Sequence, residues 1–344
     1  MSEGRQAIAW EHGVVSVEAL GGMLGPTLFI LPDGRQVAPF QVAPWADEPG
    51  GDELPGILRR LRGEWPCVPF GSDSDRPASG GWPASAATPT ADGFPHGYSS
   101  NHDWRLAPGG DGLALSITYP DTHPIERLER RIVPDPDAAA LDFELTIIAR
   151  RDCLLPIGLH PVMRLPTTPG SFEIEVPGTS PAMTFPGEVD ASAIFEPGQY
   201  ADDWHAIRLR DGKIRDPARL PFAEATEDLL QLLDPKGSVR LWNRAEGYRT
   251  RLTWNVEHFP TLMFWLSNRG RQMPPWSGRH LALGVEPVCS AFDLGPQISS
   301  APNPVSARGV PTARKFEAEE RFSTRYRIEV EQAPLAWQPA GVRR

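Results

Sequence analysis

The chain has 344 residues, of which 40% are hydrophobic and 23% charged, so it can bury a large core as one big β domain or two average domains. Its formal net charge is −10 and it has no basic stripe, which argues against nucleic acid and anionic membrane as partners. The 38 Pro and 32 Gly residues disfavour long helices and favour many short strands joined by turns.

Period-two alternation of apolar and polar residues predicts half-buried antiparallel strands along the chain. In chain order these strands cover residues 14–20, 113–119, 141–147, 172–176, 238–242 and 326–330. Two further runs, Thr261–Leu266 and Leu281–Val285, are apolar on both sides and are predicted to be central strands. Closely spaced strands with turn residues between them indicate an all-β sandwich or barrel.

Few segments depart from the strand pattern. The best helical pattern is short, Glu53–Leu61, and residues 71–95 are rich in Ser, Ala, Pro and Gly, which predicts a long surface loop or a loop over a site. No change in composition marks two domains. We therefore expect one β domain over residues 1–334 and a loosely ordered tail over residues 335–344.

Cellular location is predicted from the ends of the chain and its cysteines. The first residues lack an apolar core of signal-peptide length, and no window approaches the roughly 18 apolar residues that cross a bilayer. Three cysteines (Cys67, Cys153 and Cys289) suit reduced thiols better than a disulfide framework. We expect a soluble, cytoplasmic protein.

Three ionisable residues stand among Gly and Pro rather than on regular strand faces: His96, His160 and Glu286. His160 and Glu286 each end an apolar run and precede a proline, which favours extended backbone at the residue before it. Apolar surroundings raise the pKa of a carboxylic acid and lower that of a histidine, towards the range where general acid–base catalysis is efficient.

Structural roles compete with these catalytic ones. A histidine at a strand end is often a hydrogen-bonded structural residue, and a glutamate before proline can cap a turn or form an ion pair. The pairs Asp121/His123 and Asn101/Asp103 lack the spacing of standard zinc or calcium sites. We therefore expect no metal and no cofactor.

Three motifs in order resemble those of the aldose 1-epimerase (galactose mutarotase-like) family, which has an early His-Gly, a second His near a proline or aromatic residue, and a late Glu-Pro after an apolar strand. Here they are His96-Gly97, His160-Pro161 and Glu286-Pro287, with Trp104 after the first motif and Pro260–Trp265 before the last. The similarity spans roughly residues 21–330.

Within that family, Leu61–Gly71 followed by Phe94–Tyr98 is most similar to the glucose-6-phosphate 1-epimerase branch. Arg62 occupies the position of that branch's first phosphate-binding arginine, and Ser100 replaces its second. A phosphate dianion generally needs paired cations, which favours an unphosphorylated sugar unless Arg76 or Arg105 supplies the missing charge.

The resemblance implies a supersandwich of large antiparallel sheets that interconverts the α and β anomers of an aldohexose. Glu286 would take the proton of the C1 hydroxyl while His160 protonates the ring oxygen. His96 would hold the substrate through the ring oxygen or a neighbouring hydroxyl, and Arg62 would line the pocket. A further carboxylate would grip sugar hydroxyls; Asp228 matches best, with Glu227 and Asp234 as alternatives.

Other functions remain open from the sequence. A hexose-6-phosphate 1-epimerase would use Arg62, and a non-catalytic sugar-binding protein would use His160 and Glu286 as hydrogen-bonding groups. A glycosidase or polysaccharide lyase is less favoured, because glycosidases need two opposed carboxylates. We expect a small-molecule sugar as partner, and the sequence leaves a monomer and a homodimer equally open.

Overall fold

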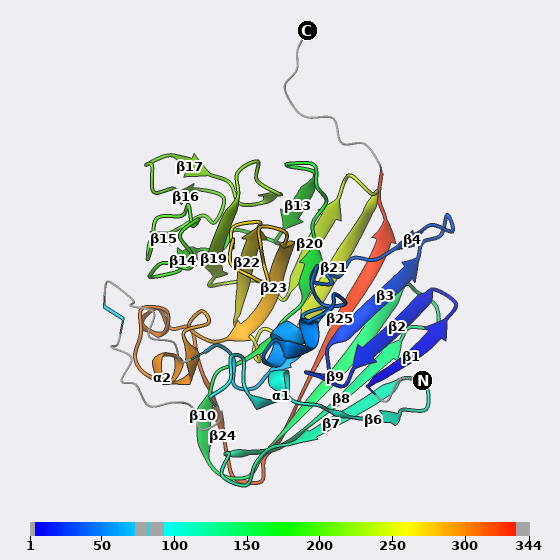
Figure 1. Cartoon of the computed structure of the whole chain (residues 1–344). Helices are drawn as coiled ribbons and strands as arrows, with labels where there is room; N and C mark the ends of the chain where they lie inside the picture. The colour runs from blue at the N-terminus through cyan, green and yellow to red at the C-terminus, as the bar shows by residue number, and fades with distance from the viewer. Residues whose placement is uncertain (1–3, 73–80, 83–92, 335–344) are drawn as a thin grey trace.

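The structure, a computed structural model, describes residues 4–72, 81–82 and 93–334. Most of the loop predicted at 71–95 and the whole tail predicted at 335–344 lie outside these residues. Within them the regular structure is nearly all β, with every strand pair antiparallel in the sheets shown in Figure 1. The predicted all-β fold class is confirmed.

Two large sheets dominate the described part of the chain. Sheet I has eight strands there, in the order β15 (Tyr200–Ala201), β14 (Ala182–Thr184), β19 (Thr226–Leu232), β22 (Thr261–Asn268), β23 (Leu281–Cys289), β11 (Ile157–Leu159) and β5 (Pro66–Cys67), with β12 (Val162–Arg164) also paired to β23. Sheet II has nine, in the order β18 (Arg219–Leu220), β13 (Phe172–Glu175), β20 (Ser238–Asn243), β21 (Tyr248–Trp254), β25 (Arg321–Gln332), β9 (Ala140–Ala149), β8 (Ile125–Pro134), β7 (Leu113–Thr118) and β6 (Arg105–Pro108).

Smaller elements flank these sheets. An N-terminal sheet, blue in Figure 1, consists of β1 (Arg5–Trp10), β2 (Gly13–Glu18), β3 (Leu24–Ile30) and β4 (Gln36–Val37). Short two-stranded pairs are β10 (Cys153–Leu155) with β24 (Arg314–Phe316) and β16 (Ile207–Arg208) with β17 (Ile214–Arg215). The helical turns are α1 (Tyr98–Asn101), α2 (Gly295–Ser300) and the 3-10 turns η1 (Gly51–Glu53), η2 (Gly56–Arg59) and η3 (Ser306–Arg308).

The predicted strands correspond to β2, β7, β9, β13, β20 and β25, and the two central ones to β22 and β23. The helical pattern predicted over residues 53–61 is wrong. The chain there forms the 3-10 turns η1 and η2, because Pro55 lacks an amide donor and Gly56 adopts a left-handed φ of 50°.

The central strands of sheet I are buried on both faces. On β22, Leu262, Phe264 and Leu266 join a core cluster that also contains side chains of sheet II. The alternate residues Met263 and Trp265 join a second cluster on the other face of sheet I. Because successive side chains on a strand point to opposite faces, sheet I has the inter-sheet core on one side and a second packed layer on the other.

A buried ion pair ties sheet II to the segment that precedes β5. Arg130 on β8 pairs with Glu64, and both side chains are inaccessible to solvent. The hydroxyl of Tyr326 on β25 donates to Glu64 Oε1 at 2.7 Å, and Arg130 Nη1 donates to the carbonyl oxygen of Gly22 at 2.6 Å. This network satisfies charges that would otherwise be costly to bury.

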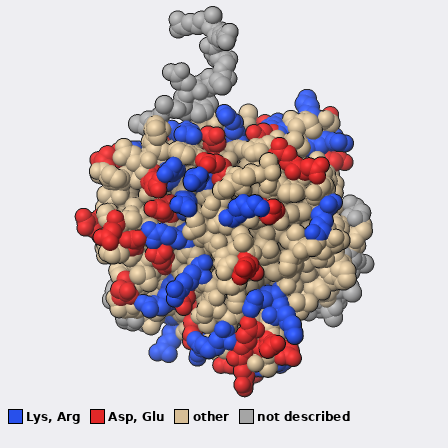
Figure 2. Space-filling model, turned by 180° about the vertical axis from the view of Figure 1, so that it is seen from behind, with Lys and Arg blue, Asp and Glu red and all other residues tan. Residues whose placement is uncertain are grey.

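Outward-facing strand residues of sheet II are charged instead. Arg325 pairs with Glu144, and Arg327 pairs with Asp142. Figure 2 shows basic and acidic side chains intermixed on the face seen from behind. None of the helices in the described ranges is long and apolar enough to cross a membrane.

We predict that Arg130→Met destabilises the fold by about 3–5 kcal/mol, because it leaves the Glu64 carboxylate buried without its cation. Urea unfolding followed by circular dichroism measures the loss. The matched control is Arg325→Met, which removes an arginine whose side chain is 81% exposed and which should cost far less. Equal losses of stability in the two variants would show that the buried Arg130–Glu64 pair contributes no more to stability than an exposed ion pair.

Candidate functional site

A pocket of about 460 Å³ opens on the face of sheet I that points away from sheet II. Its lining includes His96, His160 and Glu286, three residues that are far apart in the sequence. Apolar side chains such as Trp65 and Trp265 form much of the wall. The volume and the mixture of an apolar wall with a few polar groups are typical of a small-molecule site.

His160 directly follows β11 and is 5% exposed. Its imidazole stacks on the indole of Trp65, with ring centroids 4.2 Å apart and planes 15° from parallel. Its backbone N–H donates to the carbonyl oxygen of Trp65 at 2.9 Å, so backbone and ring are held against the same residue. His160 Nδ1 is buried and has no hydrogen-bond partner among the described residues.

Glu286 lies on the central strand β23 and is fully buried. Its Oε1 is 3.6 Å from His160 Nε2, and neither carboxyl oxygen accepts a hydrogen bond from any residue that the structure describes. Gly284, two residues earlier on the same strand face, makes room for this side chain, since a Cβ added there would lie 2.2 Å from Glu286 Oε1.

Burial acts on the two groups in opposite directions. It raises the pKa of the Glu286 carboxyl well above its usual range, and the negative charge of Asp293 adds to this rise. Burial lowers the pKa of His160 well below its usual range, and His96 adds to this fall. Both shifts favour the uncharged forms of the two groups.

His96 reaches the pocket from the turn before α1. Its backbone has a left-handed φ of 58°, and its ring stands edge-on to that of His160 with centroids 4.9 Å apart. The following Gly97 has φ 82°, and a Cβ there would lie 2.4 Å from the carbonyl oxygen of Val68. The His-Gly motif is therefore explained by a tight turn packed on the chain just after β5.

The structure does not bring Asp228 into this pocket. Asp228 and Glu227 are neighbours on β19, so their side chains point to opposite faces of sheet I. Asp228 faces away from the pocket and accepts hydrogen bonds from the backbone N–H groups of Ile194 and Phe195, each at 3.1 Å. Of the two alternatives, Glu227 lies on the pocket side, and Asp234 forms an ion pair with Lys236 at 2.6 Å.

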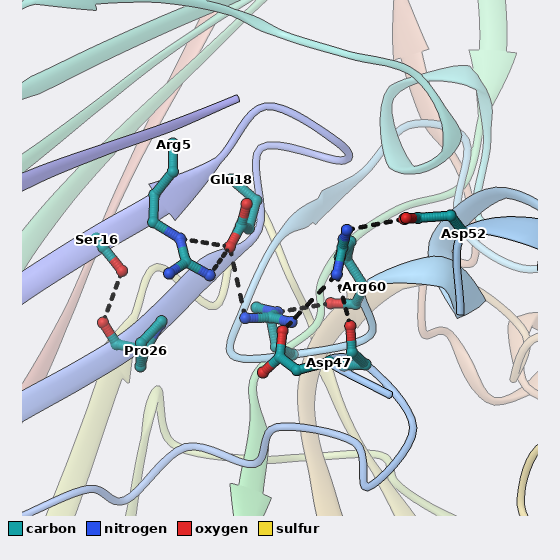
Figure 3. A network of polar contacts seen from close by, with 9 residues as sticks. Arg5, Ser16, Glu18, Pro26, Asp47, Asp52 and Arg60 are labelled. Carbon is teal, nitrogen blue, oxygen red and sulfur yellow. Dashed lines mark hydrogen bonds and ion pairs between the residues drawn. The ribbon is translucent and has the colours of Figure 1, made fainter. Parts of the chain in front are cut away.

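Arg62 is also absent from the described pocket lining, which corrects its expected place. Its side chain is 1% exposed and pairs with Glu18 at 3.4 Å and with Asp47 at 2.9 Å. Figure 3 shows these two acidic partners in a network that joins the N-terminal sheet to the segment carrying η1 and η2. Arg105 is exposed on β6 and Arg76 lies outside the described residues.

Sequence reasoning missed Arg271 and Asp293, which line the pocket from loops. Arg271 Nε lies 3.1 Å from Glu227 Oε1. Neither residue stands in a recognisable motif; the signal available was their proximity in sequence to the predicted strands that carry Trp265 and Glu286.

Another hollow, of about 500 Å³, lies over sheet II and is lined by ion-paired residues such as Asp142 and Arg327. Its described residues include no acid–base pair whose side-chain atoms lack hydrogen-bond partners, as those of His160 and Glu286 do. No group of three or more His, Cys, Asp or Glu residues arranged to hold a metal ion occurs within the described ranges.

Comparisons with known proteins identify the fold. No protein-family model and no curated protein sequence matches the chain. Solved structures do match it, among them a candidate aldose 1-epimerase from Escherichia coli K12, at 14% identity and TM-score 0.64, covering 96% of this chain and 100% of that one.

Two further matches have similar names. A galactose mutarotase-like protein from Lactobacillus casei ATCC 334 has 14% identity and TM-score 0.59, covering 95% of this chain and 100% of its own. A GalM/aldose epimerase homologue from C. elegans has 13% identity and TM-score 0.60, covering 96% of this chain and 99% of its own. The chain therefore has the galactose mutarotase-like fold.

We predict that Glu286→Gln stabilises the protein increasingly as the pH rises above about 4.3, the pKa of an unfolded glutamate. The raised pKa means that the folded wild type keeps a proton that the unfolded chain releases, so wild-type stability falls with rising pH through this window. The side-chain amide of Gln does not titrate, so the variant lacks this fall in stability. Urea unfolding at a series of pH values measures the difference, which should grow by at most about 1.4 kcal/mol per pH unit.

The control for this series is Glu286→Asp, which retains a carboxyl group in the pocket and should retain a falling stability as the pH rises. A constant difference between the wild type and Glu286→Gln from pH 4 to pH 8 would contradict the predicted burial of an uncharged carboxyl.

Proposed function

We propose that this protein is an aldose 1-epimerase, a carbohydrate isomerase that interconverts the α and β anomers of an aldohexose by acid–base ring opening. The observation that carries the proposal is the His160–Glu286 pair. Its facing atoms are 3.6 Å apart at the wall of a hexose-sized pocket, and His160 Nδ1 and both Glu286 carboxyl oxygens have no hydrogen-bond partner in the described chain.

Anomer interconversion needs one proton removed and one proton added at neighbouring oxygens. The C1 hydroxyl and the ring oxygen are both bonded to C1, so two groups as close as His160 and Glu286 can serve them together. Glu286 takes the hydroxyl proton and His160 donates a proton to the ring oxygen, which breaks the bond between C1 and that oxygen. After rotation about C1–C2, the reverse transfers close the ring on the other face.

Substrate binding prepares the pair for these roles. In the unliganded pocket burial disfavours both charged forms, a carboxylate at Glu286 and an imidazolium at His160. A sugar hydroxyl supplies the hydrogen-bond donor that the carboxylate lacks, and the ring oxygen supplies an acceptor for His160. Hydrogen bonds of this kind stabilise the charged forms and so favour a proton on His160 and a carboxylate at Glu286.

The surrounding residues hold the pair in position. Trp65 orients the His160 ring by stacking, and Gly284 leaves the space that the Glu286 side chain fills. His96, whose ring stands at 85° to that of His160, would hydrogen-bond a sugar oxygen beside the reacting centre. Preorganised groups need little rearrangement during the reaction.

A phosphorylated hexose has less support. Arg62, the expected phosphate ligand, is buried and engaged by Glu18 and Asp47. Ser100, which replaces the second arginine, donates its hydroxyl to the carbonyl oxygen of His96 at 2.6 Å. We therefore favour a neutral hexose as substrate.

We predict that His160→Ala and Glu286→Gln each lower the rate of anomer interconversion by about 10²–10⁴, the usual loss of one general acid or base. Polarimetry of freshly dissolved α-D-glucose and α-D-galactose measures the rate. The matched control is His205→Ala, which removes an exposed histidine paired with Asp216 at 2.9 Å and should leave the rate unchanged.

Rates in both pocket variants equal to the wild type would refute the proposed function. Saturable sugar binding by calorimetry, without anomer exchange by NMR in the wild type, would instead identify a sugar-binding protein without catalysis. Inhibition by glucose 6-phosphate that weakens with salt would favour the phosphorylated substrate.

A further inference from the structure

Arg271 is a pocket residue to which the proposed chemistry gives no role. It lies on the connection between β22 and β23, the strands that carry Trp265 and Glu286, and it lines the same pocket. Its guanidinium carbon is 5.6 Å from the ring centroid of Trp265 and 4.6 Å from that of Trp276. Two indole rings and Glu227 therefore hold the guanidinium in place.

The anchor for Arg271 is itself fixed. Glu227 is fully buried on β19, and its Oε1 accepts from Trp265 Nε1 at 2.6 Å as well as lying 3.1 Å from Arg271 Nε. Its Oε2 accepts from Ser267 Oγ at 3.1 Å, and Ser267 is in turn hydrogen-bonded to His280 Nδ1 at 2.8 Å. Such a fully bonded carboxylate cannot move without breaking several contacts.

The two terminal nitrogens of Arg271 remain available to a ligand. Glu227 Oε1 lies beside Nε, and neither Nη1 nor Nη2 donates a hydrogen bond to any residue that the structure describes. The side chain is 30% exposed and contributes to the pocket wall. A planar guanidinium held in this way offers several N–H donors in a fixed fork.

The charges around the fork favour a neutral ligand. Arg271 is the one Lys or Arg in the described lining of the pocket, and Glu227 already balances its charge. The described lining contains no second Lys or Arg. A phosphate or carboxylate on the sugar would therefore meet one cation whose charge Glu227 already compensates.

We propose that Arg271 is a specificity-determining residue whose Nη groups donate hydrogen bonds to a pair of neighbouring hydroxyls on a neutral aldose. This inference rests on the proposed function. The contacted hydroxyls lie away from C1, because the anomeric centre is taken by His160 and Glu286, and no hydrogen bond or ion pair joins Arg271 to either residue in the described structure.

The experiment measures binding separately from catalysis. Calorimetry determines the affinities of D-glucose, D-galactose and the 2-, 3- and 4-deoxy analogues of D-glucose for the wild type, Arg271→Met and Arg271→Lys. Loss of hydrogen bonds to a charged group should weaken binding of the parent sugar by about 10- to 100-fold in Arg271→Met. Arg271→Lys, which keeps the charge without the planar fork, should be intermediate.

The deoxy analogues separate a direct contact from a structural effect. The wild type should bind the analogue that lacks a contacted hydroxyl about 10-fold more weakly than the parent, and Arg271→Met should bind the two equally. The matched control is Arg279→Met on the same connection, whose arginine pairs with exposed Glu48 at 2.5 Å and does not line the pocket. It should behave as the wild type.

Each contrary result has a definite meaning. Equal weakening of every analogue by Arg271→Met would overturn the proposal and leave Arg271 a purely structural residue. If the wild type binds D-glucuronate or glucose 6-phosphate more tightly than D-glucose, and Arg271→Met loses this preference, the proposal of a neutral ligand is wrong. If Arg271→Met interconverts anomers and binds the sugar with unchanged affinity, this inference alone is refuted. If the wild type binds no sugar at all, the proposed function is refuted as well.

Discussion

The fold and the pocket both depend on the double burial of the central strands of sheet I. β19, β22 and β23 have one face in the core shared with sheet II and the other in a second apolar layer. Because successive side chains on a strand point to opposite faces, each side chain on these strands packs in one of the two layers. Met263, Trp265 and Glu286 share a layer, and that layer contains the pocket.

Two buried acidic residues in this framework, Glu64 and Glu286, have different surroundings. Glu64 and Arg130 are fully paired and further bonded to Tyr326 and a backbone carbonyl, as expected of a structural network. Glu286 is equally buried, but its oxygens have no hydrogen-bond donor in the described structure. An unsatisfied buried carboxyl lowers stability, and such groups concentrate where a ligand completes the bonding.

Much of this arrangement could be predicted from the sequence. Alternation located β2 and five strands of sheet II (β7, β9, β13, β20 and β25), and the doubly apolar runs located β22 and β23, because burial pattern and strand period are local properties. It did not locate β8 or β21, which also belong to sheet II. That His160 and Glu286 share a site was expected from the resemblance of the ordered motifs. The pattern around Glu286 suggested a residue off the regular strand faces, whereas Glu286 lies within β23, which continues to Cys289. The turn at Pro55-Gly56, in contrast, overrode an apparent helical pattern.

The errors have a common physical origin in contacts between distant segments. Asp228 and Glu227 are one residue apart, and strand register alone decides which of them faces the pocket; that register is set by pairing with β22. Arg62 matched a motif position, but Glu18 and Asp47 engage it. Arg271 gave no local signal, because its orientation comes from Glu227 and from indole rings on other parts of the chain.

Gly284 shows that a side chain can be positioned by the absence of another. The Glu286 carboxyl folds back over a strand position where even one methyl group would collide with it. The position of the carboxyl group therefore depends on the tripeptide Gly284-Val285-Glu286 and not on the glutamate alone. If the glutamate were transplanted onto another β scaffold without a glycine two residues before it, its side chain would be forced into a different rotamer.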